Sequence, residues 1–188
     1  MESRCKNYPP FCLGLAGPIG SGKSTIISIL QRMRSFNVVG FGDYVTGIAK
    51  DRKLPIERAV LQSITEEVIS SLGHRGFVSR VLASHNIEPG QSVIVDGIRF
   101  QDTIGAVRDE LAPMPFFVLY VSLDEEVRLT RLKLRDGVDD IAQKEFDNHF
   151  SEVEVQSLVR DESDLIVSNT SRAKTFDEID RFLRVQFS

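Results

Sequence analysis

The segment from Phe11 to Phe36 has a pattern that few folds accommodate. An apolar run, FCLGLA, is followed directly by the loop GPIGSGK and then by the amphipathic stretch STIISILQRMRSF. A short apolar run bounded by glycine is typical of a buried strand, and apolar residues three and four apart predict a helix. The chain is therefore expected to begin with a strand, a tight loop of bare backbone and a helix.

The loop has the spacing G-x-x-x-x-G-K-[ST], which is typical of the phosphate-binding P-loop. Glycines let backbone N–H groups converge on an anion, and the following helix presents its positive end to the same anion. In this interpretation Lys23 contacts the β- and γ-phosphates of ATP, and the Ser24 hydroxyl binds Mg²⁺. The alternative is a glycine-rich turn that caps a helix. The residues predicted to bind ATP here are Gly17, Gly20, Ser21, Gly22, Lys23, Ser24 and Thr25.

Composition excludes several other classes of protein. The 188 residues carry a net charge of −4, which argues against a nucleic-acid-binding surface. There is no run of about 18 apolar residues and no apolar signal-peptide core, so we expect no membrane association. Cys5 and Cys12 form no disulfide framework or metal-binding spacing. The chain is predicted to be one cytoplasmic domain spanning residues 1–188.

Apolar runs alternate with helical patterns along the remaining chain. The predicted strands are 11–16, 37–41, 91–96, 115–122 and 164–168. The predicted helices are 24–35, 43–52, 56–72, 75–86, 100–111, 124–135, 141–160 and 176–185. Continuous apolar strands are buried on both faces, as in a parallel sheet. The sequence thus predicts an α/β fold: a three-layer P-loop NTPase fold with about five parallel strands flanked by helices, and a short helical lid.

Two further residues of chemical interest follow the third predicted strand, in VIVDGIRFQD. Asp96 ends that strand, where an acid would meet Mg²⁺; the alternative is that it caps a helix. Arg99 lies in the loop at the same edge, and its planar guanidinium suits a phosphate; the alternative is a surface charge. Ligands of such sheets bind at the carboxyl ends of the strands.

Taken together, these motifs resemble the nucleoside-monophosphate kinase group. Its relatives include the phage-type deoxynucleoside monophosphate kinases, archaeal kinase-like proteins and the dephospho-CoA kinases. The resemblance covers about residues 11–185 and rests on the P-loop, a "GD" after the second strand, the "DG-x-R" turn, a basic helix leading to "R…DD", and the tail DNHFSEVEV…SDLIVSNTS. It implies transfer of the γ-phosphoryl group of ATP, with Mg²⁺, to a small acceptor.

The resemblance also implies roles for single residues. Arg99 would contact the acceptor phosphate, and Asp43 of the "GD" would bind the acceptor within a helical region at about 43–90. Asn169 matches an asparagine of the loop near adenine, although it is equally a turn residue. The better-known enzymes carry an arginine three residues after "GD", where this chain has Thr46. The candidates to replace that arginine are Lys50, Arg52, Arg75 and Arg80.

The predicted lid, at about 128–141, begins with Arg128, Arg131 and Arg135 on one side of a helix. Arg131 and Arg135 are predicted to be catalytic, closing over the transferring phosphoryl group. Val127 and Leu134 form an adjacent apolar stripe that would hold this helix to the body. The alternative is a solvated helix face paired with Glu125, Asp136 and Asp139.

Three functions remain open. The first is ATP-dependent phosphoryl transfer to a nucleoside or deoxynucleoside monophosphate, giving the diphosphate and ADP. The second is a kinase resembling dephospho-CoA kinase, in which Asp43 would take a proton from a hydroxyl acceptor. The third is a regulatory ATPase. The expected partner is a small-molecule phosphate acceptor, and the chain is expected to be a monomer or homodimer.

Overall fold

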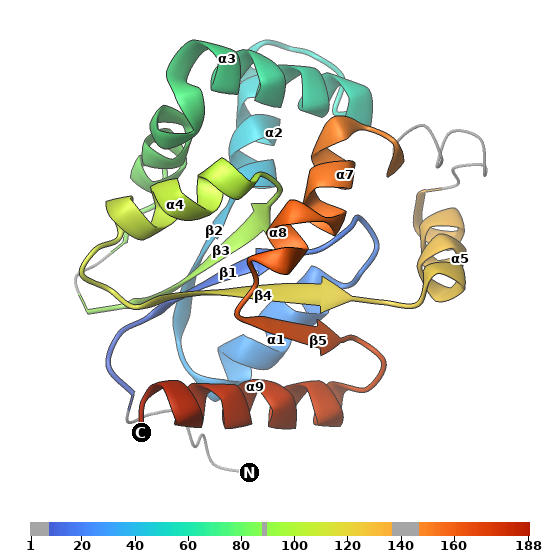
Figure 1. Ribbon diagram of the computed structural model, residues 1–188. Coiled ribbons are helices and arrows are strands. Elements are labelled where there is room, and N and C mark those ends of the chain that lie inside the picture. Colours follow the sequence, from blue (N-terminus) through green and yellow to red (C-terminus); the bar gives the residue numbers. More distant parts are fainter. Residues whose placement is uncertain (1–7, 88–89, 137–146) are drawn as a thin grey trace.

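The computed structural model describes residues 8–87, 90–136 and 147–188 (Figure 1). Its centre is a five-stranded sheet in the order β2-β3-β1-β4-β5, with each neighbouring pair parallel. The strands are β1 (Cys12–Ala16), β2 (Phe36–Gly40), β3 (Ser92–Ile98), β4 (Phe116–Ser122) and β5 (Leu165–Ser168). The predicted five-stranded parallel α/β sheet is confirmed.

Helices cover both faces of the sheet (Figure 1). They are α1 (Lys23–Met33), α2 (Phe41–Asp51), α3 (Arg58–Ala83), α4 (Gln101–Glu110), α5 (Glu125–Asp136), α7 (Phe150–Gln156), α8 (Leu158–Asp161) and α9 (Arg172–Gln186). Helices α1 and α9 pack against one face through Ile26, Leu30 and Ile179. The opposite face is covered by α2, α3, α4, α7 and α8. The three-layer prediction is therefore confirmed.

Strand β1 shows why the apolar runs are continuous. All five of its residues are buried. Cys12 and Ala16 face the core under α2 and α3, whereas Leu13 and Leu15 face the core under α1 and α9. A strand with a hydrophobic layer on each face cannot alternate between apolar and polar residues.

The break predicted between helices 56–72 and 75–86 is present, because Gly73 at φ 68° and ψ 173° interrupts α3 with a kink. The structure differs from the sequence prediction in two other elements. The single helix predicted for 141–160 is wrong in its described part. There α7 begins at Phe150 after its N-cap His149, and Ser157 (ψ −88°) separates α7 from α8; residues 141–146 lie outside the described residues. Strand β3 runs on to Ile98, so Asp96 lies within it.

An irregularity in β3 shapes the site. Leu15 of β1 pairs with Asp96, but Ala16 pairs with Ile98, so Gly97 is skipped. Gly97 has φ 91°, which glycine adopts without the strain that a side chain brings. The bulge sets Asp96 between Leu15 and Gly40, the last residue of β2.

The carboxyl ends of all five strands meet at one edge of the sheet (Figure 1). The predicted P-loop follows β1, α2 follows β2, Arg99 follows β3, α5 begins after β4, and Asn169 follows β5. None of the helices in the described residues is both long and apolar enough to cross a membrane.

Candidate active site

The loop between β1 and α1 depends on glycine at positive φ. Gly17, Gly20 and Gly22 have φ of 137°, 86° and 92°. Gly22 is the N-cap of α1, and no side chain caps that helix or places an acid in its first turn. The positive end of α1 therefore faces the loop without an acidic side chain in its first turn to offset it.

Asn169 braces this loop from the end of β5. Its side chain is buried, and Nδ2 donates to the Ser21 carbonyl at 2.9 Å and to the Gly22 carbonyl at 3.4 Å. A Cβ on Gly22 would lie 1.9 Å from the same Nδ2. Asn169 is thus brought to the backbone of the P-loop, which sequence reasoning did not foresee.

Lys23 folds back over the loop. Its Nζ donates to the carbonyl of Gly17 at 2.8 Å and to that of Pro18 at 3.3 Å. Burial lowers the pKa of Lys23 to about 7; the positive charges of Arg99 and Arg135 add to this effect, and Asp96 opposes it. The ammonium therefore lies among other cations at a site where an added anion would be stabilised.

Asp96 faces the same place. Burial raises the pKa of its carboxyl group; the positive charge of Lys23 opposes this and the negative charge of Asp43 adds to it. Its buried Oδ1 has no hydrogen-bond partner among the described residues. A buried carboxylate oxygen without a donor fits a cation. The described residues contain no group of three His, Cys, Asp or Glu side chains arranged for a metal, so protein ligands alone would be too few.

Arg99 is paired with an acid that the sequence prediction did not assign. Its guanidinium bonds to Glu152, whose other oxygen, Oε2, accepts from the backbone N–H of Ile19 at 3.3 Å. Glu152 is only 1% exposed. Burial lowers the pKa of Arg99 to about 10, with Asp96 opposing and Arg58 adding to the shift, so Arg99 stays charged near neutral pH.

Glu152 carried a signal in the sequence. It stands three and seven residues before Val155 and Val159, both fully buried. A glutamate spaced in this way from core residues is expected to be buried with them. A buried glutamate almost always has a cation or hydrogen-bond donor as its partner. The motif SEVE also supplies Glu154, which accepts from the Gln101 N–H at 2.7 Å and so satisfies the first turn of α4.

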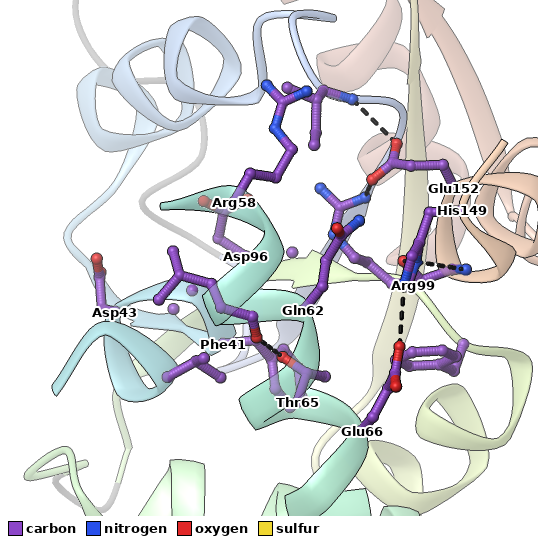
Figure 2. Close-up of a pocket in the computed structure, with 18 of the residues that line it drawn as sticks. Phe41, Asp43, Arg58, Gln62, Thr65, Glu66, Asp96, Arg99, His149 and Glu152 are labelled. Atoms are coloured by element: carbon purple, nitrogen blue, oxygen red, sulfur yellow. Dashed lines mark hydrogen bonds and ion pairs between the residues drawn. The ribbon is translucent and has the colours of Figure 1, made fainter. Parts of the chain in front are cut away.

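A cavity of about 820 Å³ opens beside the P-loop. Its walls come from α2, α3, β3 and the start of α7 (Figure 2), and some residues between Asp43 and Phe77 of the predicted 43–90 region line it. Among the lining residues are Lys23, Asp43, Arg58, Gln62, Asp96, Arg99, Arg135, His149 and Glu152. His149 bonds to Glu66 at 3.0 Å and to the Ser151 hydroxyl at 2.9 Å.

None of the four candidates for the arginine absent at Thr46 lines the cavity: Lys50, Arg52, Arg75 and Arg80. Arg52 pairs with Glu67 at 2.6 Å, and Arg75 pairs with Glu110 at 3.2 Å. Arg58, at the start of α3, does line it and shares the wall with Arg99 (Figure 2). Its position had no motif to mark it.

Helix α5 packs through residues other than those predicted. Val127 and Leu134 are 44% and 84% exposed, so the expected apolar stripe is wrong. Leu132 is buried instead, beside Arg128. A Cβ on Gly20 would lie 2.9 Å from the Leu132 side chain, so the glycine permits this close packing.

Arg128 is a buried structural residue. Its five N–H groups reach the carboxylates of Glu125 and Asp147 and the carbonyl of Ile19, at 2.6–3.1 Å. Arg131 and Arg135, by contrast, are exposed. Arg135 lines the cavity, and Arg131 Nη1 comes within 3.4 Å of the position a Gly22 Cβ would take. The later part of the predicted lid, 137–141, lies outside the described residues.

Known proteins share this architecture. A UPF0200 protein of Thermococcus gammatolerans is 26% identical over 128 residues, 67% of each chain. The APS kinase of Mycobacterium tuberculosis, solved with AMPPNP and APS, superposes with a TM-score of 0.62 at 16% identity, covering 94% of this chain and 98% of that one. For a shikimate kinase of Acinetobacter baumannii bound to shikimate the TM-score is 0.52 at 16% identity, with coverage of 99% and 98%.

The chain therefore shares its fold with these two kinases. The profile of the AAA_18 family, described as an AAA domain, matches residues 13–155, which include the P-loop, Asp96, Arg99 and Glu152. Since the match spans most of the chain, the protein belongs to the AAA_18 family.

Proposed function

We propose that this protein transfers the γ-phosphoryl group of ATP to a small anionic acceptor, a nucleoside or deoxynucleoside monophosphate. The observation that carries the proposal is the set of cations around one cavity at the P-loop. Lys23, Arg58, Arg99 and Arg135 all line it. Burial lowers the pKa values of Lys23 and Arg99, and repulsion from neighbouring arginines adds to both shifts. Two phosphate-bearing ligands would relieve that repulsion.

The ATP phosphates are assigned to the P-loop and the first turn of α1. Backbone N–H groups from Gly20 to Thr25 would contact them, while Lys23 would turn from its own loop carbonyls to the β- and γ-phosphates. Asn169 holds the loop in shape by its bonds to two loop carbonyls. Arg131 and Arg135 are placed to neutralise charge on the transferring group.

Ser24 and Asp96 would hold Mg²⁺, the hydroxyl directly and the carboxylate at the oxygen that lacks a donor. Mg²⁺ retains waters and binds through few protein ligands plus substrate phosphates, which agrees with the sparse set of acids here. When bound, Mg²⁺ would neutralise phosphate charge that develops during transfer.

The acceptor is assigned to the cavity beyond Lys23. About 820 Å³ is within the range of small-molecule pockets. Arg99 and Arg58 would hold the acceptor phosphate, and α3 would contact the rest of the molecule through Gln62 and Thr65. A phosphate acceptor is already a nucleophile, so such an enzyme needs no general base.

The proposal is tested by ATP consumption with a panel of nucleoside monophosphates, deoxynucleoside monophosphates and dephospho-CoA. We expect turnover that depends on a monophosphate. Turnover with dephospho-CoA alone would identify a hydroxyl acceptor. Slow ATP hydrolysis unaffected by any acceptor would favour the regulatory ATPase and contradict the proposal.

Replacement of Arg99 by lysine is expected to raise the acceptor KM by about tenfold and to change the KM for ATP less than twofold. Lysine keeps the charge but lacks the planar fork, so it cannot bond to Glu152 and to a phosphate in the same geometry. Steady-state kinetics with each substrate varied in turn measures both constants. An equal rise in both would place Arg99 on the ATP side.

One observation favours a hydroxyl acceptor as the second candidate. Asp43 lines the cavity near Asp96, whose pKa its charge helps to raise. It is not a helix N-cap, because α2 begins at Phe41 with Gly40 as its N-cap. A free carboxylate there could act as a general base.

Asp43→Asn separates the two candidates. Asparagine matches aspartate in size but cannot take up a proton. A monophosphate kinase should lose at most about tenfold in kcat, and a hydroxyl kinase on the order of a hundredfold or more. We expect the smaller loss. A thousandfold fall in kcat with unchanged substrate binding would instead favour the hydroxyl acceptor.

A further inference from the structure

We propose that Glu152 is a positioning residue that joins Arg99 to the P-loop, so that the acceptor arginine and the ATP-binding loop behave as one unit. The inference rests on the proposed function, since it gives Arg99 and the loop their two ligands. One carboxylate oxygen accepts from the guanidinium of Arg99 (Figure 2), and the other accepts from the N–H of Ile19.

The two ends of this link are far apart in the chain. Glu152 stands 133 residues after Ile19 and 53 after Arg99. It is 1% exposed, so water does not compete for its oxygens. Bonds from a buried carboxylate to a guanidinium and to a backbone N–H are charge-assisted and stronger than neutral ones.

The same residue of the loop is also held through its carbonyl group. Arg128 Nη1 donates to the Ile19 carbonyl at 3.1 Å. The same guanidinium also binds the Asp147 carboxylate, through Nη1 at 3.0 Å and through Nη2 at 2.6 Å. Ile19 thus has its N–H on the acceptor side and its C=O on the α5 side. The loop can shift at this point only by breaking a charge-assisted bond.

Glu152 also sets the strength of Arg99 as an anion ligand. The carboxylate offsets part of the guanidinium charge and holds one Nη group, which leaves the remaining N–H groups of the fork for the cavity. The Arg99 guanidinium is therefore held accurately in place, although it attracts the acceptor phosphate less strongly in the ground state than an unpaired guanidinium would. Because the enzyme gains rate from contacts aligned in the transition state, loss of Glu152 should affect kcat more than binding.

The test compares Glu152→Gln with Glu154→Gln as the matched control. Both are acids of α7 that accept from a backbone N–H, but Glu154 bonds to Gln101 and not to the P-loop. Glutamine keeps one acceptor oxygen and turns the other into a donor, so at position 152 it can serve Arg99 or Ile19 but not both.

We expect Glu152→Gln to lower kcat about 30- to 100-fold while the Kd for MgADP, measured by calorimetry, changes less than about threefold. Glu154→Gln should alter neither by more than about threefold. A Glu152→Gln variant that matches the control contradicts the proposal. So does a variant that loses MgADP affinity as steeply as kcat, because that is the result of a disordered site.

A second measurement needs no turnover. In ¹⁵N-labelled protein, Arg99→Lys should shift the Ile19 amide signal and speed its hydrogen exchange about tenfold or more, whereas Arg75→Lys, outside the cavity, should not. In the Glu152→Gln background the effect of Arg99→Lys on Ile19 should vanish. If Arg99→Lys alone leaves the Ile19 amide signal and its hydrogen exchange unchanged, the link is contradicted, whether or not the chain has kinase activity. Absence of turnover alone, with the link present, contradicts only the proposed function.

Discussion

Lys23→Ala is expected to lower kcat by about a hundredfold to a thousandfold without weakening the fold. The loss follows because a charge held at the transferring phosphoryl group contributes several kcal/mol in the transition state. Retention of a tenth of the wild-type kcat would contradict the role of the P-loop in catalysis. Lys50→Ala, an exposed lysine of α2, is the control and should leave kcat within twofold.

The same variant has an expected dependence on pH. The pKa of Lys23 is lowered to about 7 from 10.5, mainly by burial, so the folded protein releases this proton while the unfolded chain still holds it. The charged side chain therefore costs stability below pH 7, and that cost declines as the pH rises from 7 toward 10.5. Lys23→Ala should exceed the wild type in free energy of unfolding at pH 6, by a margin that narrows at pH 9. Urea denaturation at both pH values measures this.

Arg128→Ala is expected to reduce the free energy of unfolding by about 3 kcal/mol, the largest loss of stability among the arginines of α5. The side chain is 2% exposed, and its removal would take two charge-assisted hydrogen bonds from Asp147, itself 19% exposed. Hydrogen bonds to Glu125 and Asp147 hold the pKa of Arg128 above its usual range although burial acts to lower it.

Arg131→Ala is the matched control for Arg128→Ala, one turn further along the same helix and exposed. It should change the free energy of unfolding by less than about 0.5 kcal/mol while lowering kcat, the reverse of the balance expected for Arg128. Chemical denaturation and steady-state kinetics on both variants decide the matter. Equal losses in the free energy of unfolding would contradict the expectation that burial decides how much each arginine contributes to stability.

The arginines of α5 show how far helical spacing can be taken. The intervals of three and seven residues correctly place Arg128, Arg131 and Arg135 toward one side of the helix. Spacing does not tell how deep each residue lies. Arg128 and Leu132 meet the P-loop at Gly20, so Arg128 is buried and paired, whereas Val127 and Leu134 point to solvent. Depth depends on where another segment of the chain packs.

Glu152 shows a second limit. An acid in line with Val155 and Val159 predicts a buried, paired carboxylate, but the partner could be any donor in the chain. Only the packing of α7 against the edge of the sheet brings Arg99 and the Ile19 N–H to it. Asn169 is a similar case. The sequence indicates a turn residue after β5, whereas in the structure its side chain donates a hydrogen bond to the Ser21 carbonyl of the P-loop.

The sequence by itself determined the five-stranded parallel sheet, the P-loop and the strand edge at which the site would lie. These features depend on short-range patterns: the spacing of glycines and lysine, and apolar runs long enough for a strand with a core on each face. The tertiary structure alone decided that Glu152 binds Arg99, that Arg128 is buried, and that Arg58 lines the cavity. The physical reason is that a buried charge is stable only where distant segments supply its partners, and nothing local in the chain encodes which segments those are.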